Sequence, residues 1–326
     1  MSKPFEAFFK GDKEIIHPLF KGAKILTAKE AAGVDLGPLT QLQGKWVSKT
    51  LSGSLIAGWN VISVPGPISA SQKDGFVLEV IPYTEELTFC PIVAAGNRGA
   101  FQADGTTENQ QQITGLLYQQ IITSTCAADK PCTDRGFPKG SEIHAERGLL
   151  LFIQNFTENY DIARLSVIPH GNTLLALGQS FIGPPLNNDF FGKASTLPTD
   201  LRGISLPGLG MDQFGTRQFA AFDQEDPNTF LATTLGKDEI TAMTTLSFST
   251  ANPNGGILNI PFVTNNADAI QLTSNFYIET IEGQSALQLQ YTQTINLVFP
   301  PTGSATKVLW PHVTINTLTK VSDSCE

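Results

Sequence analysis

Apolar and polar residues alternate along much of the chain, most regularly near its C-terminus. Between Leu287 and Phe299 the apolar residues occupy every second position, and the alternation is broken only at Gln293. Successive side chains of a β-strand point to opposite faces, so this period of two predicts a half-buried strand. Proline and glycine residues at 300–303 predict a turn, after which the chain returns through a second strand at 308–318. The region 285–321 is therefore predicted to form an antiparallel hairpin.

Similar strand patterns, separated by Gly, Pro and Asn, recur through the rest of the chain. Charged residues make up 16% of the sequence, against about 25% in a typical soluble protein. This composition suits short strands and polar turns better than amphipathic helices. We therefore predict an all-β fold, either an antiparallel barrel or a sandwich. The predicted strands lie near 59–64, 76–83, 86–89, 112–123, 142–152, 164–169, 173–178, 243–250, 257–263 and 275–281.

The pattern predicts one β domain at 34–322, preceded by an N-terminal arm at 1–33. The arm carries phenylalanines among lysines and glycines, and we expect it to pack on the outside of the domain. Residues 183–230 form a long insertion rich in Gly, Pro and Phe. Its phenylalanines require a surface to bury against, so we expect the insertion to cap one end of the barrel and narrow access to a pocket.

Charge and hydropathy restrict the partners of the protein. The net charge of −9 argues against nucleic-acid binding, which needs clustered Lys and Arg. No stretch reaches the roughly 18 apolar residues of a membrane span, and residues 1–5 lead into a charged segment rather than a signal peptide, so we expect no membrane partner and a cytoplasmic location. Four cysteines are too few for a disulfide framework, although Cys126 and Cys132 could pair in an oxidising compartment.

The histidines are the main candidates for chemistry. His17 lies in the N-terminal arm, and His170 precedes Gly171 in a predicted turn, where a polar residue is expected in any case. His144 and His312 both lie in the middle of predicted strands, so each faces either solvent or the interior. For each of these two histidines, a structural role and a role as a ligand are both open. The cysteine spacing does not fit a zinc site, and the sequence carries no nucleophile-elbow or dinucleotide motif.

Three short motifs occur in order along the chain and resemble those of a known family. They are Leu42-Gln43-Gly44-Lys45-Trp46, His144-Ala145-Glu146-Arg147-Gly148 and Pro311-His312. In this order they are similar to motifs of the nitrobindin group of haem-binding β-barrels. The resemblance covers about 37–180 and 270–321 and leaves the central segment unmatched, because this chain is much longer than a nitrobindin.

The resemblance implies an antiparallel lipocalin-like β-barrel, here with an N-terminal arm and a long central insertion. It implies haem b as the cofactor and His312 as the axial ligand of the iron, with Trp310 and Trp46 as further contacts of the cofactor. His144 would lie at the rim or on the distal side of the haem. Ferric members of that family isomerise peroxynitrite to nitrate.

Three functions follow as hypotheses, each with a small molecule or oxidant as the partner. We expect peroxynitrite isomerisation, because the resemblance favours it; this reaction needs an open ferric iron and little proton transfer, which suits a distal wall lined only by apolar side chains. If His144 faces the pocket, it becomes a catalytic acid–base group, and a haem peroxidase is the alternative. The third hypothesis is a carrier of haem or of another apolar molecule, without turnover.

Overall fold

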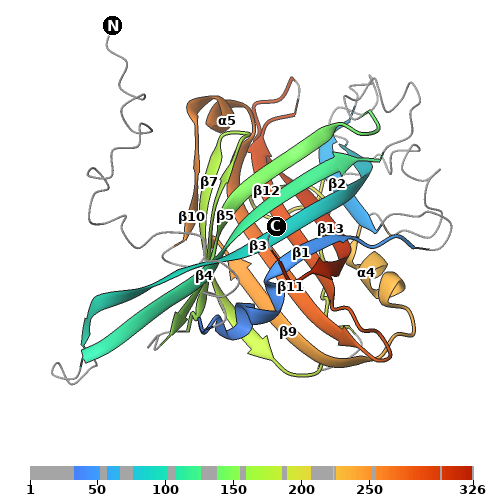
Figure 1. Ribbon diagram of the computed structural model, residues 1–326. Coiled ribbons are helices and arrows are strands. Elements are labelled where there is room, and N and C mark those ends of the chain that lie inside the picture. The colour runs from blue at the N-terminus through green and yellow to red at the C-terminus, as the bar shows by residue number, and fades with distance from the viewer. Residues whose placement is uncertain are drawn as a thin grey trace, which may run out of the picture.

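A computed structural model describes residues 33–51, 57–66, 76–101, 108–125, 138–154, 159–185, 189–206, 223, 225–251, 255–301 and 303–324. The described residues form a closed antiparallel β-barrel of ten strands, which confirms the predicted fold class (Figure 1). None of the helices in these ranges is long and apolar enough to cross a membrane. The N-terminal arm up to residue 32, and the possible pairing of Cys126 with Cys132, lie outside the described residues.

The elements follow the chain in this order. The first half contains the 3-10 helix η3 (Gly37–Leu42) and the strands β1 (Gly44–Ser48), β2 (Gly58–Pro65), β3 (Phe76–Phe101), β4 (Glu108–Ser124), β5 (Glu142–Gln154), β6 (Ile162–Ile168) and β7 (Asn172–Ile182). The second half contains β8 (Thr199–Asp200), α4 (Asn228–Leu235), β9 (Ile240–Ser249), β10 (Gly256–Asn259), α5 (Pro261–Asn266), β11 (Asp268–Ile281), β12 (Gln288–Phe299) and β13 (Val308–Ser322). Figure 1 shows the far ends of β3 and β4 projecting together beyond the barrel.

The barrel closes where the last strand meets the first ones. Neighbouring strands follow the order β13, β12, β11, β9, β7, β6, β5, β4, β3 and β2. One part of β13 pairs with β2, with His312 opposite Ile62, and its far end pairs with β1. Both β1 and β2 also pair with β3, so together they fill one position in the wall.

A large apolar cluster fills the interior at the end of the barrel that η3 closes. Leu39 and Leu42 of η3 are fully buried there against residues from the inner faces of the strands, such as Leu116 and Leu289. Leu42 and the Trp46 of β1 belong to the same cluster. In Figure 1, η3 lies at the lower end of the barrel and α5 at the upper end.

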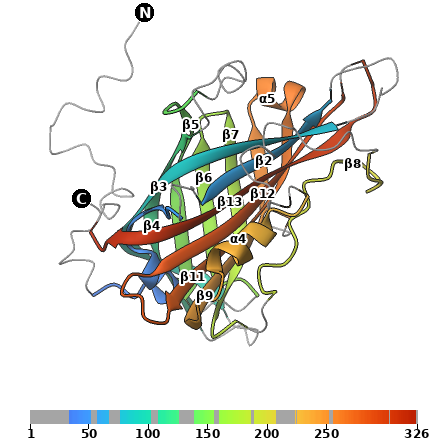
Figure 2. The same ribbon diagram turned by 90° about the vertical axis from the view of Figure 1, so that its right-hand side faces the viewer.

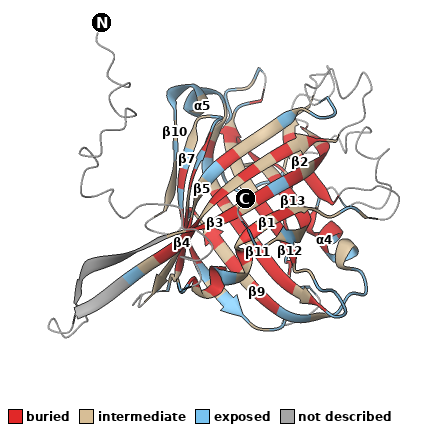
Figure 3. Ribbon diagram, in the orientation of Figure 1, coloured by how far each residue is buried: buried red, intermediate tan, exposed pale blue. Residues whose placement is uncertain are grey.

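A second apolar cluster lies on the outer face of the wall. Trp59 and Val61 belong to it, and they alternate along β2 with Asn60 and Ile62, which face the interior. The covering residues come from α4 and from residues 190–206, and Figure 2 shows α4 against the outside of β12 and β13. Between the two clusters, β2, β12 and β13 carry runs of consecutive buried residues, which are red in Figure 3, so residues on both faces of these strands are covered.

This second cluster corrects our expectation for the insertion at 183–230. Two phenylalanines in its described part are buried against the outer wall: Phe191 packs edge-on against Tyr277, and Phe230 against Trp59, with ring centroids 5.1 and 6.2 Å apart. None of its described residues lines the cavity at the α5 end. Apolar side chains on the outward face of β2, β3, β11 and β13 supply the surface that the phenylalanines need.

The predicted strand at 257–263 is also corrected. Only β10 is a strand there, and the chain turns into α5 at Pro261. Proline has no N–H to donate to a ladder, and it suits the first turn of a helix, where that donor has no partner. Phe262 and Val263 therefore lie at the opening of the barrel and not in the sheet, where they were predicted.

Candidate ligand-binding cavity

The end of the barrel near α5 encloses a cavity of about 480 Å³. This volume falls within the range of roughly 300–1,000 Å³ that is usual for small-molecule sites. Its walls are mainly aliphatic, with a few polar groups set among them, and Phe262 and Val263 of α5 lie at its edge. The aliphatic side chains include Ile62, Ile81, Ile122, Ile168, Leu174, Leu272, Ile295 and Leu297, and the polar ones include Asn60, Gln120, Gln293 and Thr314.

His312 lies in the wall of this cavity, on β13. Its backbone pairs with Ile295 of β12 on one side and with Ile62 of β2 on the other, so the strand is held from both sides. The Nε2 atom is buried and has no hydrogen-bond partner among the described residues. Burial, and then the nearby His144 and His170, lower the pKa of His312 to about 4. At neutral pH the ring is therefore an uncharged imidazole with a lone pair to offer.

His144 and His170 line the far side of the cavity. Along the closed strand order, β13 and β5 are separated by β2, β3 and β4 in one direction and by five strands in the other. His144 of β5 therefore lies nearly opposite His312, and His170 follows β6 in the turn before β7. Nδ1 of His144 lies 3.3 Å from Nε2 of His170, and burial, then His144, lowers the pKa of His170.

Two residues after His144 on β5, the buried side chain of Glu146 points into the barrel. Its Oε2 lies 3.4 Å from Nε2 of His144, and its Oε1 accepts hydrogen bonds from Nη2 of Arg164 at 2.8 Å and from the Tyr118 hydroxyl. Burial alone would raise the pKa of Glu146. The charge of Arg164, aided by hydrogen bonds from His144 and Tyr118, outweighs burial and holds the pKa of Glu146 well below its usual range. Glu146 is thus an ionised carboxylate inside the barrel.

Arg164 joins this carboxylate to other strands across the interior. Its Nε donates to the Tyr118 hydroxyl at 2.9 Å, and its Nη1 donates to Gln293 at 2.6 Å and to Ser274 at 3.2 Å. These partners come from β4, β12 and β11, while Arg164 belongs to β6 and Glu146 to β5. The guanidinium therefore binds all four neighbours through its fixed set of donors.

The geometry explains the spacing of His144, Glu146 and Gly148. Residues two apart on β5 face the same side of the wall, so all three positions face the interior. A Cβ atom at Gly148 would lie 2.7 Å from the ring of Tyr118 and 2.1 Å from the carbonyl oxygen of Leu165. A glycine at position 148 leaves room for Tyr118, whose hydroxyl binds Glu146, so Gly148 helps to hold Glu146 in place.

Neither tryptophan of the predicted site lines the cavity. Trp46 lies in the apolar cluster near η3, where its Nε1 donates to the Leu42 carbonyl at 2.7 Å. Trp310 stacks on Phe299, donates to the carbonyl of that residue at 3.0 Å, and belongs to the second apolar cluster. Their positions therefore give no support to the expected contacts with a cofactor.

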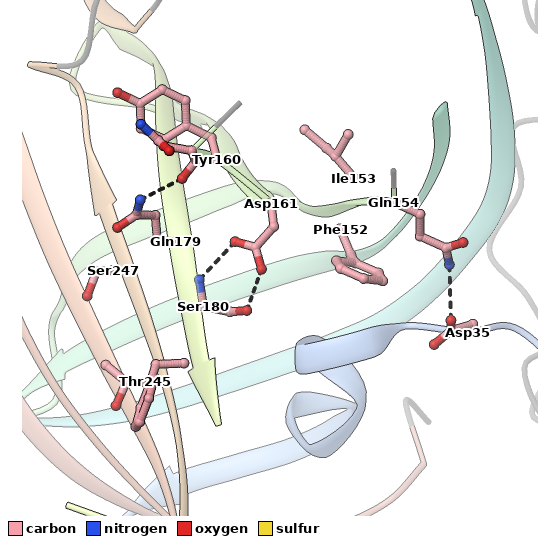
Figure 4. A pocket seen from close by; sticks show the side chains of 12 residues that line it. Asp35, Phe152, Ile153, Gln154, Tyr160, Asp161, Gln179, Ser180, Thr245 and Ser247 are labelled. Carbon is pink, nitrogen blue, oxygen red and sulfur yellow. Dashed lines mark hydrogen bonds between the residues drawn. The ribbon is translucent and has the colours of Figure 1, made fainter. Parts of the chain in front are cut away.

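A wider hollow of about 900 Å³ lies at the η3 end of the wall, among β5, β7 and β9 (Figure 4). Its acidic side chains are already bound within the protein. Asp161 accepts hydrogen bonds from the amide and hydroxyl of Ser180 at 2.8 and 2.5 Å, and Asp35 accepts one from Gln154 at 3.1 Å. Because the acidic groups of this hollow already have hydrogen-bond partners, we take the histidine-lined cavity as the candidate site.

Comparisons with known proteins add little to this site. No family model matches the chain, and no curated protein matches it. The structure is similar to the crystal structure of Rv2717c from M. tuberculosis, with 14% sequence identity, coverage of 88% of this chain and 100% of that one, and a TM-score of 0.38. A likeness this distant carries no argument about function. Within the described residues, no group of three or more His, Cys, Asp or Glu is arranged to hold a metal ion.

Proposed function

We propose that this barrel binds haem b in the cavity near α5, with His312 as the axial ligand of the iron. The observation that carries the proposal is the neutral imidazole of His312, whose Nε2 is buried in the wall of an apolar cavity and has no hydrogen-bond partner in the described part of the chain. Haem iron takes a neutral imidazole, and the porphyrin needs apolar walls. His312 would hold the iron, and the aliphatic side chains of the cavity would contact the ring.

The bound haem would supply an iron centre able to react with a small oxidant such as a peroxide or peroxynitrite. The residues opposite His312 bear on which of these reactions is supported. His144 lines the cavity and lies beside the ionised Glu146. The opposite wall therefore carries an acid–base group in addition to apolar side chains, which was the condition for a peroxidase-type reaction. We propose this reaction in preference to peroxynitrite isomerisation.

A carrier without iron is the second candidate. It is favoured by the largely aliphatic walls of the cavity, which suit an apolar ligand of many kinds. In that case His312 would act as a polar contact rather than as a metal ligand.

The test is to titrate the purified protein with ferric haem and record its absorption spectrum. We expect a Soret band with the features of histidine ligation. His312→Ala should lose these features while its circular dichroism stays that of a folded barrel. His144→Ala is the matched control, since it removes the facing imidazole and should keep the axial ligand. A spectrum unchanged by His312→Ala would refute the assignment, and binding of an apolar fluorescent probe without haem uptake would favour the carrier.

The loaded protein then separates the two reactions. Stopped-flow mixing with hydrogen peroxide and a phenolic donor should show donor oxidation that is lost in His144→Ala. Faster decay of peroxynitrite, unchanged in His144→Ala and without donor oxidation, would support isomerisation instead.

A further inference from the structure

The strongest unused feature of the interior is the buried carboxylate of Glu146. We propose that Glu146 is a positioning residue, which fixes the tautomers of His144 and His170 and so makes the two rings a path by which a proton from solvent reaches His144 in the cavity wall. The use of these protons rests on the proposed function, whereas the fixed tautomers do not.

The carboxylate is held rigidly in one orientation. Glu146 is 1% exposed and Arg164 is 2% exposed, so neither side chain has water as an alternative partner. Oε1 is occupied by Arg164 and Tyr118, which leaves Oε2 to face the His144 ring. Among the described residues, Oε2 has no hydrogen-bond partner of standard geometry, and Nε2 of His144, at 3.4 Å, is the group that faces it.

The orientation of the carboxylate determines where His144 carries its proton. An ionised carboxylate only accepts hydrogen bonds, so the nitrogen that faces it, Nε2 of His144, must carry hydrogen. In the neutral ring Nδ1 is then an acceptor. Nδ1 faces Nε2 of His170 at 3.3 Å, so the second ring must in turn carry its hydrogen on Nε2. One carboxylate thereby sets the tautomers of both histidines.

The pair connects two environments. His170 is exposed, in the turn between β6 and β7, whereas the side chain of His144 is only 18% exposed and lies in the cavity wall. A proton taken up by Nδ1 of His170 from solvent allows its Nε2 proton to pass to Nδ1 of His144. His170 ends neutral, and His144 gains one positive charge beside the negative charge of Glu146. No bond other than N–H changes, and no co-reactant is needed.

A second buried carboxylate provides a matched control. Glu85 is 3% exposed and accepts hydrogen bonds from Gln120, Tyr291 and Asn316 at 2.7 to 2.8 Å. In the described part of the chain it makes no hydrogen bond to a histidine, and its link to His144 is an electrostatic interaction through space. Burial raises the pKa of Glu85, in contrast to that of Glu146. Glu85→Gln therefore changes a buried acid in the same barrel that makes no hydrogen bond to the histidine pair, so it separates a hydrogen-bonded carboxylate from one that acts on His144 only through space.

The experiment is nitrogen-15 spectroscopy of the histidine rings in the full chain without haem, so that its outcome is independent of haem binding. The rings are assigned with His144→Asn and His170→Asn. We expect His144 in the Nε2–H form near neutral pH, with the Nε2–H signal lost or divided between both tautomers in Glu146→Gln and retained in Glu85→Gln. His170→Asn should also retain it, because Glu146 sets the tautomer.

Two outcomes would overturn the proposal: an Nδ1–H form of His144 in the unchanged protein, or an Nε2–H signal that Glu146→Gln leaves as it was. A purely structural ion pair between Glu146 and Arg164 would give the second outcome. If Glu146→Gln does not fold, the unchanged protein still decides the first point. Glu146→Asp then decides the second, because it keeps the charge beside Arg164 but shortens the side chain, and it should weaken the Nε2–H preference.

Discussion

Replacing Arg164 by methionine tests how much the interior depends on one guanidinium. Methionine keeps an unbranched side chain, but it removes the charge and the donors that bind Glu146, Tyr118, Gln293 and Ser274. Removing one partner of a buried ion pair typically costs about 3–5 kcal/mol, because the other charge is left without compensation. We expect Arg164→Met to lower the free energy of unfolding by about this amount at pH 7.

The double variant Arg164→Met/Glu146→Gln isolates the charge from the lost packing. It removes both charges, so it should be more stable than Arg164→Met alone, although it carries one more substitution. Urea unfolding at pH 7 measures this through the midpoint, with the slope unchanged. Equal losses in the single and double variants, or a loss below about 1 kcal/mol for Arg164→Met, would show that the pair is not held as described.

The pH dependence supplies a second check on the same pair. The pKa of Glu146 is depressed in the folded protein, so its contribution to stability is complete above the unfolded pKa of about 4.3 and is lost as the pH falls below it. Without Arg164, burial dominates and raises the pKa of Glu146. The deficit of Arg164→Met should therefore shrink between pH 7 and pH 4, and a constant deficit would contradict the role of the charge.

Two further variants test other positions of the barrel wall by urea unfolding. Gly148→Ala should destabilise the protein by about 1–3 kcal/mol, because its Cβ would meet the Leu165 carbonyl and the Tyr118 ring. Gly256→Ala is the control, because nothing lies within 4 Å of the added carbon there. Equal losses of stability in the two variants would contradict the close packing around Gly148. Burial raises the pKa of Glu279 to about 8, so the folded protein keeps a proton that the unfolded chain releases, and stability should fall as the pH rises from about 4 to 8. Glu279→Gln should remove this loss, whereas Glu86→Gln at the surface should not, and an unchanged pH slope in Glu279→Gln would refute the assignment.

The sequence predicted most of the strands, though not β1 or the helix that replaces the end of the strand expected at 257–263, and it did not predict what the strands enclose. The period of two predicts the β12–β13 hairpin, and it places His144 and His312 on strands where both can face inward. The break in the alternation at Gln293 marks an inward position whose side chain accepts a hydrogen bond from Arg164. The pattern shows that this position is polar, but the partner lies on a distant strand and leaves no local signal.

His170 was missed for a similar reason. A histidine in a turn looks like any polar turn residue, and only the strand order brings that turn to the end of the barrel where β5 begins. The register of the antiparallel β5–β6 pairing, with Arg147 opposite Val167, is what places His170 near His144. Arg164 and Tyr118 carry no motif of their own, because their roles depend on contacts across the barrel interior.

The closing seam of the barrel has a consequence for how the chain reaches this structure. β2 pairs with β13, and β1 pairs with β13 as well, so nearly the whole barrel sequence separates the two sides of the seam. Contacts of such separation carry a high loop-closure cost, and they form slowly. Until β13 arrives, the edges of β2 and β12 expose unpaired backbone groups that other chains can bind. The yield of refolding should therefore depend on protein concentration through the rate of this last closure, more than on the stability of the finished barrel.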